Sequence, residues 1–100
     1  MSGVVYTEPK GTKKILNFSG SILTAGTAAL DVSSINEPTT IQVYNAHASA
    51  ALTLNILTPY VLAANVVAGE FLTLRTEFKT ASLTNTSGST ITYRVLVSGY

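Results

Sequence analysis

The chain has 100 residues, of which 46% are apolar and 11% are charged, with a formal net charge of +1 and no cysteine. This apolar content excludes a disordered chain, and the length fits one domain. A net charge near zero gives no electrostatic drive toward nucleic acid, so we expect no nucleic-acid partner.

The first segment, residues 1–14, is predicted to be an extended N-terminal arm. Pro9 and Gly11 interrupt regular structure there, and three of the six basic residues fall within it. We expect the arm to become ordered against a partner protein, although a frayed terminus is the alternative. The predicted partner-binding residues are an apolar anchor and the basic residues that follow it: Val4, Val5, Tyr6, Lys10, Lys13 and Lys14.

Residues 15–100 are predicted to form a single all-β domain, because apolar and polar residues alternate with the period of a half-buried strand. The alternation is clear in 16–18, 41–44, 52–56, 71–75 and 91–98. Turn-forming residues separate these runs at 19–21, 25–27, 36–38, 58–59, 68–70 and 85–89. The alanine-rich segment 46–51 is predicted to be a loop or the start of a strand.

Turns at this spacing indicate an antiparallel β-sandwich or a jelly roll of about seven or eight strands. The alternation also predicts which side chains the domain buries. We expect these to include Leu54, Ile56, Leu72, Leu74, Val95 and Val97.

The residues that usually carry enzyme chemistry are scarce. His47 is the only histidine, and its neighbours place it in a loop or at a strand edge, where a structural role is the usual one. The acids Glu8, Asp31, Glu37, Glu70 and Glu77 form no catalytic motif. We therefore expect no enzyme activity, no catalytic residues and no cofactor. We also expect no metal, although backbone carbonyls with Asp31 and Glu37 leave a weak calcium site open.

Carbohydrate binding is the alternative function, because small sandwiches often bind sugars on exposed aromatic side chains. Tryptophan is absent, and Tyr93 shares a face with apolar residues, so it is expected in the core. Tyr44 and Tyr60 are then the candidates for such a site. A tyrosine on a sheet also commonly packs across strands, and both interpretations remain open here.

Residues 41–100 resemble, in overall character, the small capsid decoration or cement proteins of tailed bacteriophages. The resemblance lies in Thr40–Asn45, in Ala68–Leu74 and in the final run Tyr93–Tyr100. It implies a non-enzymatic virion protein, often a homotrimer, that binds and stabilises an assembled shell of major capsid protein. A carbohydrate-binding module or a fibre or adhesion domain is the alternative.

The expected location follows from this resemblance and from the absence of a recognisable targeting segment. No secretory signal peptide is evident at the N-terminus, and no stretch reaches the roughly 18–20 apolar residues of a membrane helix. We therefore expect synthesis in the host cytoplasm, no membrane partner, and a final place on the capsid surface of the virion.

Overall fold

The computed structural model describes residues 13–100, and within them it contains eight β-strands and no helix. The strands are β1 (Lys14–Ile22), β2 (Thr27–Leu30), β3 (Pro38–Asn45), β4 (Leu52–Leu57), β5 (Val61–Val66), β6 (Phe71–Arg75), β7 (Thr80–Thr84) and β8 (Ile91–Gly99). The predicted all-β sandwich is confirmed. No helix in this range is long and apolar enough to cross a membrane.

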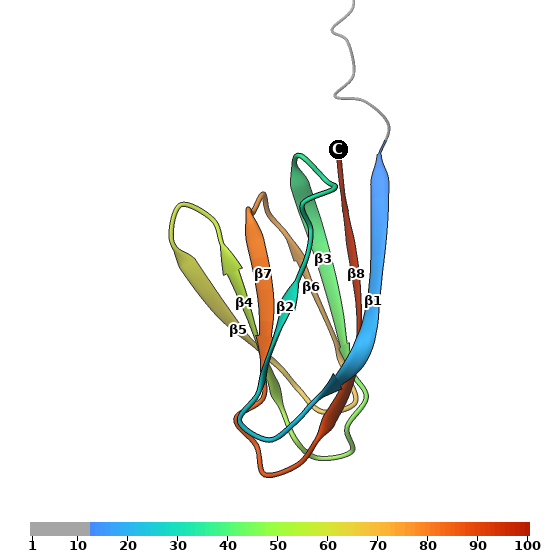
Figure 1. Ribbon diagram of the computed structural model, residues 1–100, viewed down its shortest axis with the longest axis vertical. Helices are drawn as coiled ribbons and strands as arrows, with labels where there is room; N and C mark the ends of the chain where they lie inside the picture. Colours follow the sequence, from blue (N-terminus) through green and yellow to red (C-terminus); the bar gives the residue numbers. More distant parts are fainter. Residues whose placement is uncertain (1–12) are drawn as a thin grey trace, which may run out of the picture.

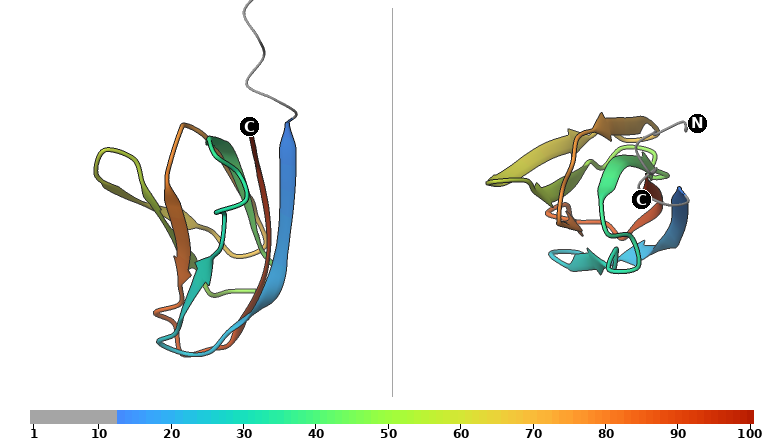
Figure 2. Two further views of the ribbon diagram at one scale, coloured as in Figure 1. Left: turned by 45° about the horizontal axis from the view of Figure 1, so that its top comes forward. Right: turned by 90° about the horizontal axis from the view of Figure 1, so that it is seen from above.

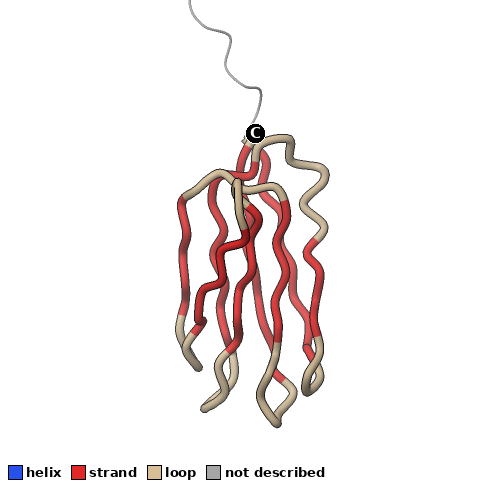
Figure 3. Tube along the Cα trace, turned by 90° about the vertical axis from the view of Figure 1, so that its left-hand side faces the viewer, coloured by secondary structure: helices blue, strands red, loops and turns tan. Residues whose placement is uncertain are grey.

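The strands form two four-stranded sheets that pack face to face (Figure 1). Sheet A has the order β1-β8-β3-β6 and sheet B the order β2-β7-β4-β5, and every neighbouring pair is antiparallel. Strands that follow each other in sequence often lie in opposite sheets, which is the connectivity of a jelly roll. Seen from above in Figure 2, the strands surround a common interior. The loops gather at the two ends of the long axis (Figure 3).

The core forms because alternate residues of each strand point to the interior. Ile41 of β3 lies between Val97 of β8 and Leu74 of β6, and Leu54 of β4 lies between Leu83 of β7 and Ala64 of β5. Completely or almost completely buried apolar side chains include Ile41, Val43, Leu52, Leu54, Ile56, Val66, Leu83, Ile91, Val95 and Val97. Tyr93 is also buried, as expected.

Two residues expected in the core are only half-buried. Leu72 and Leu74 pack against the core but keep part of their surface exposed. Both belong to β6, which is an edge strand of sheet A. An edge strand has a neighbour on one side only, so its inward side chains are less completely covered than those of β3 or β8.

The predicted break at 19–21 is wrong, because these residues lie within β1 and pair with β8. Gly20 lies opposite Tyr93, and a Cβ at Gly20 would come within 3.1 Å of the tyrosine Oη. The glycine therefore makes room for a buried aromatic side chain. The loop predicted for 46–51 is confirmed.

Two buried asparagines hold the loops at one end of the sandwich. The Asn85 side-chain amide donates to the carbonyls of Ile22 and Ser89, at 2.9 and 2.6 Å. The Asn45 amide donates to the carbonyls of Ala50 and Val66, at 2.8 and 3.1 Å. Each buried amide thus joins the end of a strand to a loop by hydrogen bonds to backbone carbonyls, which makes these asparagines structural.

Candidate functional site

Strand β5, at the edge of sheet B, carries an exposed surface that is rich in apolar side chains and has no charged ones. The sequence has no Asp, Glu, Lys or Arg between Glu37 and Glu70, and β5 lies inside this uncharged segment. Large exposed apolar side chains gather on it and next to it: Tyr60, Val61, Leu62 and Val67. We call residues 60–67 the β5 edge.

The β5 edge has exposed apolar side chains on both faces. Val61, Ala63 and Asn65 point to the outside of sheet B, and all three are exposed. On the inward face, Val66 is fully buried, but Leu62 keeps 37% of its surface exposed, and Tyr60 in the preceding turn keeps 69%. The inward face therefore opens toward the β4–β5 turn, where this hairpin leans away from the other strands (Figure 1).

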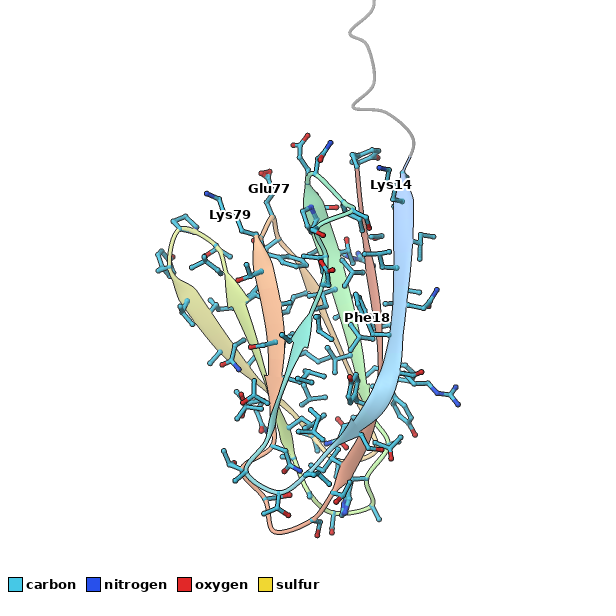
Figure 4. All side chains as sticks on the ribbon, in the orientation of Figure 1. Lys14, Phe18, Glu77 and Lys79 are labelled. Carbon is cyan, nitrogen blue, oxygen red and sulfur yellow. The ribbon has the colours of Figure 1, made fainter. Side chains whose placement is uncertain are left out.

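A groove of about 1040 Å³ lies beside this open end. Its walls come from the β4–β5 turn and from the end of β6 with the loop to β7, and its apolar lining includes Tyr60, Leu62, Leu74 and the buried Phe78. Charged residues of both signs also line it, among them Glu77 and Lys79, which Figure 4 labels. The groove could accept apolar side chains that are flanked by polar or charged groups.

A smaller depression of about 520 Å³ lies on the outer face of sheet A. Tyr44 of β3 and Phe71 of β6 face each other across the strands, with ring centroids 4.7 Å apart and planes tilted by 30°. Tyr44 thus packs across strands. Tyr60 belongs to the β4–β5 turn of the other sheet, so Tyr44 and Tyr60 do not share a face on which one sugar could rest.

His47 has a structural part in the β3–β4 loop. Its Nδ1 accepts hydrogen bonds from the backbone N–H groups of Ser49 and Ala50, at 3.0 and 2.8 Å. The backbone N–H of His47 in turn donates to Oδ1 of Asn45 at 2.9 Å. The ring nitrogen that would serve as a base is engaged in holding the loop.

The acids of the described residues do not converge. Within 13–100, no three His, Cys, Asp or Glu side chains lie together as a metal site would need. Asp31 accepts hydrogen bonds from the hydroxyl and the backbone N–H of Ser33, at 2.6 and 3.0 Å. These bonds favour the ionised carboxylate and hold the pKa of Asp31 below its ordinary value of 3.8.

Four of the predicted partner-binding residues, Val4, Val5, Tyr6 and Lys10, lie outside the described residues. Lys13 is exposed, and Lys14 begins β1, with Nζ donating to the carbonyl of Ser34 at 3.1 Å. Figure 4 shows Lys14 at the same end of the sandwich as Glu77 and Lys79.

The β5 edge itself was not predicted from the sequence. The sequence did offer a signal for it. In the run Val61–Ala64, apolar residues do not alternate with polar ones, and no charged residue lies nearby. A strand with apolar residues on both faces is typical of one that is covered on both faces.

No protein-family model matches the chain, and no curated protein matches it in sequence. Several solved structures share its fold. An oxalate oxidase is 15% identical with a TM-score of 0.56, and the match covers 83% of this chain but 41% of that one. The chain therefore spans less than half of that enzyme's length.

Two other structures match over nearly their whole length. A Bacillus endospore appendage protein, from a family of disulfide-linked pili, is 15% identical with a TM-score of 0.50, and 97% of each chain is covered. The mitogen of Yersinia pseudotuberculosis is 11% identical with a TM-score of 0.55, with 89% of this chain and 88% of that one covered. At such identities the likeness concerns the fold alone. An enzyme, a pilus protein and a mitogen all use this fold, so it does not decide the function.

Proposed function

We propose that this chain is a non-catalytic structural protein that binds other subunits in an assembled particle, and that the particle is a phage capsid which the protein decorates. The β5 edge carries the proposal. An exposed strand edge that is apolar on both faces and without charge belongs in a contact with another protein, because left in water it promotes association.

The capsid is favoured by the resemblance to cement proteins, which implies a partner in the major capsid protein and a homotrimer on the virion. The appendage protein that matches over the whole chain shows that this fold can serve a subunit of a large assembly. A cement protein needs a rigid body and complementary surfaces, and it needs no reacting groups.

The arm, residues 1–14, is proposed as the second contact with the shell. Val4, Val5 and Tyr6 would bury apolar surface on a capsid subunit, each worth roughly 1.5–3 kcal/mol before the entropy of ordering is subtracted. Lys10, Lys13 and Lys14 would add weaker contacts to an acidic surface, which salt screens.

Deletion of residues 2–12 tests this proposal. We expect the truncated protein to keep its fold and its melting temperature, and to bind undecorated capsids at least about tenfold more weakly. Co-sedimentation with capsids of the phage that carries the gene measures the binding, and a thermal melt controls for folding. Should the full-length protein itself fail to sediment with such capsids, the decoration role is wrong. If only the truncation has no effect, the arm is excluded from the contact.

A further inference from the structure

We propose that β5 pairs antiparallel with β5 of a second copy of this chain, so that sheet B of one protomer continues into sheet B of its partner. The inference rests on the proposed structural role and names the partner of the same edge. It predicts a two-fold contact, with each protomer offering the same strand, in place of the homotrimer that the resemblance to cement proteins implies.

The first argument is that β5 lacks the features that keep other strand edges apart. Antiparallel pairing to β4 leaves about half of the backbone N–H and C=O groups of β5 pointing away from the sheet. Its register with β4 is unbroken from Val61 to Val66, so no bulge or internal proline disturbs it. The strand also carries no charge.

The three other edge strands are better protected against pairing. β2 has only four residues and is followed directly by Asp31. β1 begins with Lys14, and β6 ends with Arg75. Of the four edges in the described sandwich, β5 is therefore the one best suited to accept another strand.

The second argument explains why the partner is an identical strand. In a two-fold antiparallel pair, a residue near the axis faces itself or a close neighbour, so any charge there would meet a like charge. No charged residue lies between Glu37 and Glu70, and two copies of β5 can approach without repulsion. The central residues, Ala63 and Ala64, are small and allow the strands to come close.

The third argument concerns the two faces of the strand. Antiparallel pairing brings the open end of one β5, at Leu62, beside the closed end of the other, at Val66. The exposed inward surface of Leu62 is then covered by the partner's strand. On the outer face of sheet B, the exposed row of side chains that contains Val61 continues across the two-fold axis into the partner's strand.

The experiment compares Ala63→Lys with a matched control, Ala29→Lys. Both alanines are exposed on the outer face of sheet B, in one row across the strands, and stand on its two opposite edges. Analytical ultracentrifugation of the full chain over a range of concentrations gives the dimer dissociation constant. We expect a dimer for the original chain, a dissociation constant raised at least about tenfold by Ala63→Lys, and no change with Ala29→Lys.

A charge exchange tests the two-fold geometry directly. Ala63→Glu alone should weaken the dimer as Ala63→Lys does, whereas an equal mixture of the two variants should restore dimers of mixed composition. Circular dichroism melts at low concentration confirm that all variants remain folded. Monomers at every concentration, a trimer, equal effects of Ala63→Lys and Ala29→Lys, or no restoration on mixing would each overturn the pairing. A chain that stays monomeric yet sediments with capsids would overturn this inference and leave the proposed function standing.

Discussion

The two edges of sheet B show how one sheet can end in two different ways. At the β2 edge, the inward Leu30 belongs to the hydrophobic core and keeps only 5% of its surface exposed. At the β5 edge, the inward Leu62 keeps 37% of its surface exposed. Both residues are leucines that point to the interior. The difference teaches that pointing to the interior is not enough to bury a side chain, which also needs neighbouring residues that cover it.

The largest expected effect separates these two leucines. Leu30→Ala should lower the free energy of unfolding by roughly 2–4 kcal/mol, because it empties a filled part of the core. Leu62→Ala should lower it by less than about 1 kcal/mol in the monomer, since the side chain is already partly in water. Urea denaturation at low protein concentration measures both. Equal losses of unfolding free energy would mean that Leu30 and Leu62 are equally buried in solution.

The turns beside the two edges differ in a second way. The turn from Leu23 to Gly26 leads into β2 and has Ala25 at a φ of 60°, whereas the turn from Val67 to Glu70 leads out of β5 and has Gly69 at 73°. Only glycine adopts this left-handed region without strain. Gly69→Ala should therefore lower the stability by about 1 kcal/mol, and Ala25→Gly should raise it by up to about 1 kcal/mol.

Thermal melts of Gly69→Ala and Ala25→Gly, compared with the original chain, measure these two changes in stability. A Cβ at Gly69 would meet no atom closer than the carbonyl of His47 at 4.0 Å, so a loss there reports backbone strain alone. A lower melting temperature for Ala25→Gly would contradict the strain assigned to the β2 side.

The smallest expected effect concerns the charge at the end of β2. The pKa of Asp31 is lowered in the folded protein by hydrogen bonds from Ser33, first from its hydroxyl and then from its backbone N–H. The carboxylate therefore adds stability above its unfolded pKa, and this contribution disappears as the pH falls through the lower folded pKa.

Ser33→Ala should consequently make the acid side of the stability curve less steep, because it lowers stability near neutral pH and leaves stability near pH 2 little changed. Urea denaturation between pH 2 and pH 7, at about one-unit steps, measures it. An unchanged acid side would show that Ser33 does not stabilise the carboxylate in solution. No equivalent dependence is expected from the uncharged β5 edge.

The sequence predicted the strands whose two faces differ. Alternation identified the segments of β1, β3, β4, β6 and β8, because one face of each meets the core and the other meets water. It did not identify β2, which is only four residues long, β7, which has five, or β5, whose apolar residues lie on both faces. The candidate site lies on β5, one of the strands that the alternation missed, since a strand in an interface need not have one face in the core and the other in water.

Local sequence also misled where a distant contact decides the conformation. The residues around Gly20 favour a turn, yet they extend β1, because the strand pairs with β8 and the absent side chain accommodates Tyr93. The predicted arm contacts of Val4, Val5 and Tyr6 lie beyond the described residues and stay predictions.

By itself, the sequence determined that the chain is an all-β domain with few charged side chains, because alternation, β-branched residues and turn chemistry act over neighbouring residues. Only the tertiary structure decided which strands lie at the edges of the sheets and which loops the buried asparagines hold. It also decided that β5, within the uncharged segment, is an edge strand. These features depend on which strand lies beside which, and strand order arises from contacts between residues that are far apart in the chain.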